Sequence, residues 1–392
     1  MKKYPLVKNN ITKIDLNKVI QYLKQNDPIL TQSKNVESFE KNWSNWLGVK
    51  YSVFVNSGSS ANIMSLAILK ELHPRGGEVI LPPLTWSSDI NAVIYNGFKP
   101  VFVDIDFETL SMNSSQIIKA CNNKTVAIFM SHIQGFSGLD EKLLKFLKRK
   151  KIKLIEDVCE SHGAKHKSKK LGNYGIISNF SFYYAHHMST IEGGMLCTNN
   201  KEIYEIARSM RGHGLVREFK SKKRQIKYIN KYKNLNKDFI FSYQGYNFRN
   251  NEIGGIIGNS QITRLNGNIV KRNKNHLFFL QNINPIYFFT EFKLTGSSNY
   301  AFNLILKNKN IIKFKKICSN LEKNGIEFRV GSAGGGNQLR QPYIKKLFPK
   351  NHYKKFVNTE HIHSFGMYIG NYPDLKTKDI KFICNIINQS VS

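Results

Sequence analysis

Hydrophobic and polar positions alternate along this chain with two periods, one typical of helices and one of strands. Residues 13–24 and 35–47 carry apolar side chains at helical spacing, and short β-rich runs follow them. The runs cover residues 52–55, 78–81, 101–103, 126–129 and 152–155, and helical stretches separate them near 60–71, 87–96, 114–121 and 139–149. Strands that alternate with helices predict an α/β fold with a mostly parallel central sheet covered on both faces.

The pattern of apolar and polar residues changes in the second half of the chain. Apolar runs at 176–183 and 195–198 can extend the sheet, and a helical pattern follows at 251–266. We therefore expect a large α/β domain with N-terminal helices over residues 1–270 and a smaller α+β domain over 271–392. The smaller domain has a strand-like run at 301–306 and helical patterns at 310–323 and 377–387, and the Asn- and Lys-rich stretch 216–238 is expected to be a long loop or insertion.

Composition and charge narrow the class of protein. Among 392 residues, 41% are hydrophobic, which is enough for a sizeable core and argues against a disordered chain. The net charge of +32 suggests nucleic acid, but the lysines are spread along the chain and no nucleic-acid-binding motif accompanies them. We therefore expect neither a nucleic-acid nor a membrane partner. With no apolar run behind Lys2 and Lys3 and an odd number of cysteines, five, a cytoplasmic location fits best.

The candidate chemistry lies just after the predicted strands, where parallel α/β sheets bind their ligands. Asn56–Asn62 follows one strand and opens a helix, so it can hold a phosphate or simply cap the helix. Trp86 follows another strand and can stack on a planar ring or fill the core. Asp157 ends a third strand, where a carboxylate can hold a cationic ring nitrogen or cap a helix.

His186 and His187 form the fourth candidate, in a turn of small residues between two expected strands. The pair can be a surface feature, a metal site or a catalytic site. Adjacent residues rarely ligate one metal together and no third ligand is evident, so we expect no metal.

Taken in this order, and extended by Arg208–Gly214 and Gly245–Asn250, the clusters resemble the DegT-type sugar aminotransferases, pyridoxal 5'-phosphate (PLP) enzymes of the aspartate aminotransferase fold (fold type I). The resemblance covers nearly the whole chain and implies a homodimer with shared active sites. In such enzymes an aspartate keeps the pyridine ring protonated as an electron sink. The cofactor residues implied are Gly58, Ser59 and Ser181 at the phosphate, Asn247 reaching it from the partner subunit, Trp86 stacked on the ring, Asp157 at the pyridine nitrogen and Glu160 near the ring hydroxyl. A polar strand residue at Ser181 and a loop cap at Asn247 remain the alternatives.

The family attaches its cofactor through a lysine six residues before the Glu of Glu-Gly-Gly, here Glu192, and this chain has His186 at that position. No lysine stands between Lys170 and Lys201, so a small shift in alignment restores none. An imidazole cannot attach the cofactor covalently, but it can move a proton. Three interpretations follow: an inactive homologue, a substitute lysine elsewhere, or the dehydratase branch of the family, in which histidine replaces lysine.

The dehydratase branch is the leading interpretation. It implies non-covalent PLP and pyridoxamine 5'-phosphate (PMP), L-glutamate as amino donor, and a nucleotide-linked 4-keto-6-deoxy sugar, with GDP-4-keto-6-deoxy-D-mannose expected. Loss of the C3 hydroxyl would give a 4-keto-3,6-dideoxy sugar for surface polysaccharide such as O-antigen. Related dehydrases use an iron–sulfur cluster, but Cys159 and Cys197 lie too far apart in sequence to suggest one, so no cluster is expected. An aminotransferase with an unusual base, like the perosamine synthases, and a non-catalytic homologue that binds sugar nucleotides or nucleic acid remain alternatives.

Substrate contacts are implied more weakly. The resemblance brings Arg211 and His213 close to the active site, although the alternative for His213 is a solvated residue in a glycine-rich turn. Glu327 and Arg329 resemble the strand of the small domain that faces the substrate. Position 185 departs from the pattern, because Ala185 stands where serine is expected in the dehydratase and asparagine in the aminotransferase.

Overall fold

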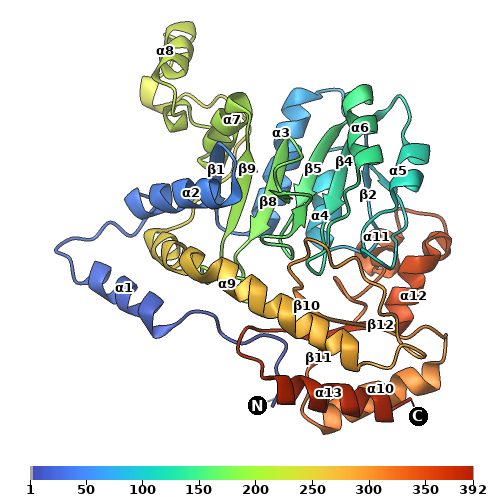
Figure 1. Ribbon diagram of the computed structural model, residues 1–392. Coiled ribbons are helices and arrows are strands. Elements are labelled where there is room, and N and C mark those ends of the chain that lie inside the picture. The colour runs from blue at the N-terminus through green and yellow to red at the C-terminus, as the bar shows by residue number, and fades with distance from the viewer. Residues whose placement is uncertain (1–2, 392) are drawn as a thin grey trace.

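The computed structural model describes residues 3–391 and is built around a seven-stranded sheet (Figure 1). The strand order is β1-β9-β8-β5-β4-β2-β3; β9 runs antiparallel to both of its neighbours, and the other adjacent strands are parallel. The mostly parallel sheet is therefore confirmed. The strands are β1 (Tyr51–Val55), β2 (Glu78–Leu81), β3 (Lys99–Phe102), β4 (Thr125–Ser131), β5 (Lys153–Asp157), β8 (Ile177–Ser181) and β9 (Gly194–Thr198).

Helices cover both faces of this sheet and bury two separate apolar cores. One face packs against α2 (Lys34–Leu47), α5 (Ser114–Ala120) and α6 (Glu141–Lys150). The other packs against α3 (Gly58–Leu72), α4 (Ser87–Tyr95) and α7 (Lys201–Arg211). The spacing of apolar residues explains the packing, since α2 buries Val36, Phe39, Trp43 and Leu47 along one stripe.

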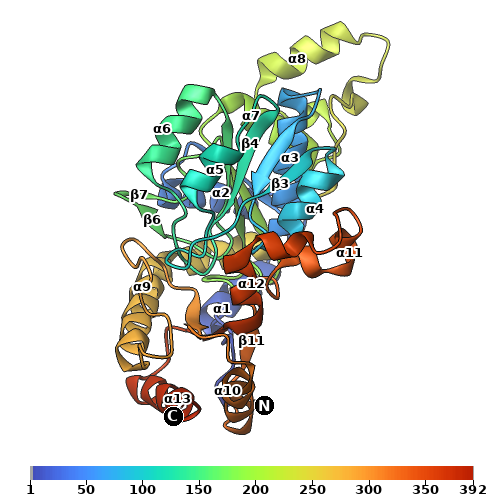
Figure 2. The same ribbon diagram turned by 90° about the vertical axis from the view of Figure 1, so that its right-hand side faces the viewer.

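The C-terminal part forms a smaller three-stranded antiparallel sheet of order β10-β12-β11, backed by helices (Figure 2). Its elements are β10 (Ala301–Ile305), α10 (Ile311–Lys323), β11 (Phe328–Val330), α11 (Pro342–Lys345), α12 (Val357–Phe365), β12 (Gly366–Gly370) and α13 (Thr377–Gln389). A third core, which includes Phe302 of β10, Ile317 of α10 and Ile383 of α13, packs α10 and α13 against the small sheet. Ile344 of α11 belongs instead to a core of the large sheet.

Helix α9 (Glu252–Asn282) joins the two parts and is longer than the stretch 251–266 predicted for it. Leu265 belongs to the core of the large sheet, whereas Phe279 belongs to that of the small sheet. The helix continues because its last turns are buried against the small sheet. The expected domain boundary at residues 270–271 lies inside α9, and the division into two domains stays a prediction.

The stretch 216–238 is not only a loop. It contains α8 (Lys222–Lys231), which projects from the body of the molecule at the top of Figure 1, between two short 3₁₀ helices. The remaining elements are α1 (Lys13–Leu23), the small hairpin β6 (Lys165–His166) and β7 (Lys169–Lys170), and 3₁₀ helices at 216–218, 237–239, 338–340 and 352–355. Within residues 3–391, none of the helices combines the length and the apolar character needed to cross a bilayer.

Candidate active site

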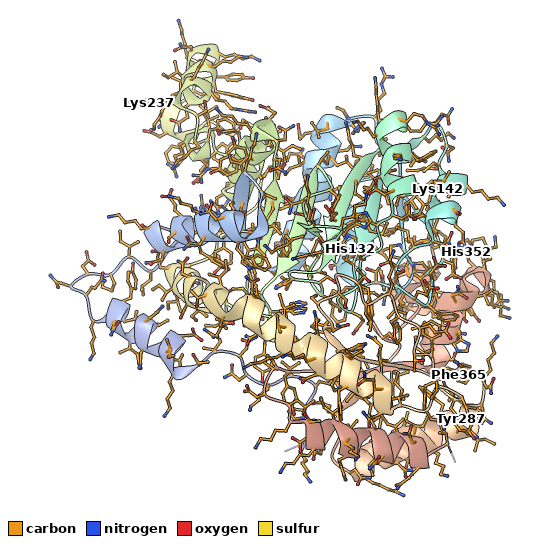
Figure 3. All side chains as sticks on the ribbon, viewed as in Figure 1. His132, Lys142, Lys237, Tyr287, His352 and Phe365 are labelled. Carbon is orange, nitrogen blue, oxygen red and sulfur yellow. The ribbon has the colours of Figure 1, made fainter. Side chains whose placement is uncertain are left out.

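The carboxyl ends of the parallel strands open into a cavity of about 750 Å³. Segments that follow β1, β2, β4, β5 and β8 line it, and α9 and the small sheet contribute the far wall. His132, labelled in Figure 3, marks this edge, since it follows the last residue of β4. The cavity gathers residues from four of the clusters that the sequence singled out.

The start of α3 forms a cradle for an anion at one side of the cavity. Ser57 caps the helix by accepting from the N–H of Ser60, and Ala61 is the first residue whose N–H bonds back to a turn of the helix. The N–H groups of Gly58 and Ser59 therefore precede the intrahelical bonds and can donate to an anion. A Cβ on Gly58 would lie 2.6 Å from Cβ of Ser181, so only glycine permits this approach.

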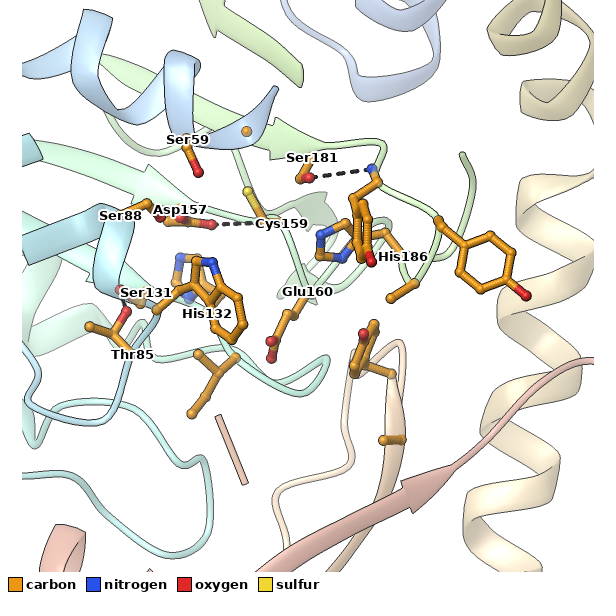
Figure 4. Close-up of a pocket in the computed structure, with 18 of the residues that line it drawn as sticks. Ser59, Thr85, Ser88, Ser131, His132, Asp157, Cys159, Glu160, Ser181 and His186 are labelled. Atoms are coloured by element: carbon orange, nitrogen blue, oxygen red, sulfur yellow. Dashed lines mark hydrogen bonds between the residues drawn. The ribbon is translucent and has the colours of Figure 1, made fainter. Parts of the chain in front are cut away.

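Asp157 occupies the end of β5 with its carboxylate fixed from two sides. Its Oδ1 accepts from the backbone N–H of Cys159 at 2.8 Å, and its Oδ2 accepts from Nδ2 of Asn62 at 2.8 Å. Figure 4 shows Ser59 and Ser181 along one side of the pocket, Glu160 on the opposite side, and Asp157 and His186 between them. A carboxylate held in this orientation suits a cationic ring nitrogen.

Trp86 and Glu160 also line the cavity. Trp86 stands at the start of α4, and 59% of its surface is exposed, so its ring is available to a ligand. Glu160 accepts from the backbone N–H of Gln134 at 3.0 Å. Burial, assisted by the nearby charge of Asp157, raises the pKa of Glu160 to about 7, so this carboxyl can accept or donate a hydrogen bond near neutral pH.

The two adjacent histidines have different environments. His186 lines the cavity, and its Nδ1 is buried without a hydrogen-bond partner among the described residues. Burial lowers the pKa of His186 to about 4, partly offset by the carboxylate of Asp157, so the imidazole is neutral at pH 7. The Nε2–H of His187 instead donates to the carbonyl of Ser298. A neutral imidazole that faces the cavity can act as a general base.

These residues fit a phosphorylated pyridine cofactor. The N–H cradle suits its phosphate, Asp157 its ring nitrogen, and Trp86 its planar face. No lysine stands among the described residues that line the cavity, so the set provides for non-covalent binding.

Glu327 and Arg329, which were predicted as substrate residues, lie on the cavity wall formed by the small sheet. Nη2 of Arg329 lies 3.0 Å from Oε1 of Glu327, and the other carboxylate oxygen accepts from the N–H of Leu6. The N-terminal segment thus helps to hold this wall, which no local sequence pattern had indicated.

Three predicted site residues lie away from the cavity. Arg211 is 1% exposed, and its Nη1 donates to Glu40 at 2.5 Å and to the carbonyl of Phe54 at 2.8 Å. The expectation that Arg211 meets the substrate is therefore corrected, because its guanidinium is enclosed by the core that surrounds β1. His213 and Asn247 are exposed, and neither lines the cavity of its own chain.

Other cavity residues were not anticipated from the sequence. Asp89 lies on α4, Arg272 on α9, and Tyr300 before β10, and all three line the cavity. Arg272 is buried and donates to the carbonyls of Tyr300 and Asn371. A polar residue on a helix, such as Asp89 or Arg272, gives the same sequence pattern whether it faces solvent or a binding site. Only the fold shows that these residues line the cavity.

The fold and the cavity together define a PLP-dependent enzyme of fold type I. The chain belongs to the DegT/DnrJ/EryC1/StrS aminotransferase family, whose model matches residues 9–388.

Among its relatives, GDP-4-keto-6-deoxy-D-mannose 3-dehydratase of Yersinia pseudotuberculosis is 31% identical over 394 residues, covering 98% of this chain and 98% of the relative. The structure of the Escherichia coli enzyme with bound hydrated PLP aligns with a TM-score of 0.89 at 29% identity, covering 99% of this chain and 100% of that one. A structure of GDP-4-keto-6-deoxymannose-3-dehydratase with a trapped PLP–glutamate geminal diamine aligns with a TM-score of 0.88 at 29% identity, covering 98% of this chain and 100% of that one.

Proposed function

We propose that this protein is a PLP/PMP-dependent sugar 3-dehydratase, a carbon–oxygen lyase. It removes the C3 hydroxyl of a nucleotide-linked 4-keto-6-deoxy sugar, with GDP-4-keto-6-deoxy-D-mannose as the expected substrate. The observation that carries the proposal is His186, a neutral imidazole lining a cavity that has no lysine among its described residues. The similarity to dehydratases over nearly the whole chain supports it.

The cofactor residues keep the roles that the sequence suggested. Gly58, Ser59 and Ser181 would hold the phosphate, Trp86 would stack on the ring, and Asp157 and Glu160 would contact its nitrogen and hydroxyl. When bound, the cofactor supplies an amine for the C4 ketone and an electron sink. The protein side chains provide orientation and proton transfer.

His186 is the proton carrier in this scheme. Its neutral imidazole accepts a proton at the start of the elimination and donates one to the C3 hydroxyl oxygen as that oxygen leaves. A lysine at this position could return a proton to the sugar and complete transamination. Histidine retains the acid–base step without a covalent link to the cofactor, and this biases the outcome toward dehydration.

L-Glutamate is the proposed amino donor, supported by the related structure with a trapped PLP–glutamate adduct. Glu327 and Arg329 are proposed to contact the sugar nucleotide, and His213 to act near the active site. The net charge of +32 favours approach of any anionic nucleotide. The product would enter the synthesis of a surface polysaccharide such as O-antigen.

We further propose a homodimer in which Asn247 completes the phosphate site of the partner subunit. Asn247 is exposed and does not line the cavity of its own chain, and both observations support this arrangement. A cytoplasmic location remains a prediction from the sequence.

The test is to incubate the protein with PLP, L-glutamate and a panel of nucleotide 4-keto-6-deoxy sugars and to weigh the products. Loss of the C3 oxygen supports the dehydratase. Gain of an amino group with the oxygen retained supports the alternative, an aminotransferase with an unusual base. Failure to bind either PLP or PMP would indicate a non-catalytic homologue.

A further inference from the structure

Asp89 is a second buried carboxylate close to Asp157. It lies in the first turn of α4 and is 1% exposed. Its Oδ2 contacts both Oγ1 of Thr85 and Oγ of Ser131, the latter at 2.5 Å. These two hydroxyl oxygens lie 2.9 Å from each other. Three oxygen atoms therefore form a closed triangle of hydrogen-bond contacts. Figure 4 shows Thr85 and Ser131 on the Asp157 side of the pocket.

The triangle has three contacts, one more than its hydroxyl groups have protons. A hydrogen bond is best formed when each contact has a proton of its own between the two oxygens. Thr85 and Ser131 carry one hydroxyl proton each, which accounts for two. With an ionised Asp89, one hydroxyl hydrogen has to serve two contacts, whereas a proton on Oδ2 of Asp89 gives each contact its own.

Asn62 links Asp89 to Asp157. Its side-chain nitrogen Nδ2 lies 2.9 Å from Oδ1 of Asp89 and 2.8 Å from Oδ2 of Asp157. The two hydrogens of one amide group therefore bridge the two carboxyl groups. Asn62 is itself 1% exposed on α3, so the bridge is fixed by the packing of that helix.

No cationic side chain of the described residues forms an ion pair with either carboxylate. The other titratable groups near Asp89 are the Cys159 thiol and the Tyr343 hydroxyl, and Nε2 of His132 faces Glu156. Ionising both of two neighbouring buried carboxyl groups without a cation has a high free-energy cost. Burial, followed by the charge of Asp157, accordingly raises the pKa of Asp89 well above its ordinary value.

We propose that Asp89 is a neutral carboxylic acid that positions Asp157 through the Asn62 amide and leaves Asp157 ionised for a cationic ring nitrogen. Asp89 is a positioning residue, since it acts through Asn62 and Asp157. The ligand class, a protonated pyridine, rests on the proposed function.

The protonation state can be measured on the apo protein by infrared spectroscopy, at a pH well above the value of about 7 for Glu160. We expect a C=O stretch of a buried neutral carboxyl in the wild type and its loss in Asp89→Asn. The matched control is Asp104→Asn, which removes another buried carboxylate that accepts from Thr359 and Asn358, and it should keep the band. A band that survives in Asp89→Asn, or that the wild type lacks, overturns the proposal.

Equilibrium binding of PMP to the apo protein gives the second readout. An asparagine at position 89 can accept from Asn62 and donate to the hydroxyls, as a neutral acid does, so Asp89→Asn should keep the affinity within roughly threefold. Asp157→Asn and Asp89→Ala should each weaken it by roughly tenfold or more. An equal loss in Asp89→Asn and Asp157→Asn would show that Asp89 acts as an anion and would refute the proposal. The infrared band does not depend on sugar turnover, so failure of the dehydratase assay leaves this test intact.

Discussion

Nε2 of His187 lies 3.1 Å from the carbonyl oxygen of Ser298, and this hydrogen bond holds the second histidine of the pair apart from the first. His186 lines the cavity instead and receives no hydrogen bond at Nδ1 from the described residues. Two neighbours in sequence thus have separate tasks, one structural and one proposed to be catalytic.

Substitution of the two histidines should therefore give unequal results. His186→Asn should lower kcat by about 10²–10⁴-fold, because it removes the general acid–base group, while binding of PMP persists. His187→Asn should have a milder effect. Release of the dideoxy sugar, measured by mass, provides the readout, and an inactive His187→Asn beside an active His186→Asn would reverse the assignment.

The pH dependence of kcat/KM should follow the low pKa of His186. The base works only when neutral, so activity should be lost as the pH falls through about 4, not through the ordinary value near 6.5. A pH series with a stability control at each point tests this expectation. A fall in kcat/KM below about pH 6.5 that is present in the wild type and absent in His186→Asn would contradict it.

Glu160 gives a separate prediction for stability. Its pKa is raised from 4.5 to about 7 in the fold, so its contribution is most favourable below the unfolded value and is lost as the pH rises toward 7 and above. Above pH 7, Glu160→Gln should raise the free energy of unfolding of the apo protein by about 1–3 kcal/mol. Denaturant titration at acidic and alkaline pH measures the difference, and an equal effect at both would be inconsistent with this origin.

The role of Asn247 can be tested by mixing subunits. Asn247→Ala should weaken cofactor retention by about 1–3 kcal/mol, because it removes a hydrogen bond to a charged acceptor. If active sites are shared, hybrids of Asn247→Ala with His186→Asn should regain activity, since one site of each hybrid dimer is complete. A fully active monomer would refute both the dimer and this role.

Arg211 should matter for stability and not for substrate binding. Arg211→Met leaves the buried carboxylate of Glu40 without its cation and should cost about 3–5 kcal/mol in the free energy of unfolding. A double variant with Glu40→Leu should recover most of this loss. An Arg211→Met protein of normal stability but raised KM would restore the substrate role.

The sequence alone determined the alternation of strands and helices, because buried parallel strands are short, nearly continuous apolar runs. β2 occupies the predicted residues 78–81, and the strands and helices of the large sheet follow one another along the chain in the predicted order. His186 could also be identified from the sequence, by counting six residues back from Glu192. The length of α9 did not follow, because its last turns are stabilised by a core that distant residues form.

Only the tertiary structure decided which polar residues share a site. Asn62, Asp89 and Asp157 come from three separate segments and meet because α3 and α4 begin, and β5 ends, at the same edge of the sheet. Arg211 lies within a motif that resembles an active-site turn, yet its partner is Glu40 on α2. Hydrogen bonds between residues far apart in the chain produce no periodic pattern in the sequence. Local patterns therefore predicted the helices and strands, whereas the contacts of each polar residue were known only from the tertiary structure.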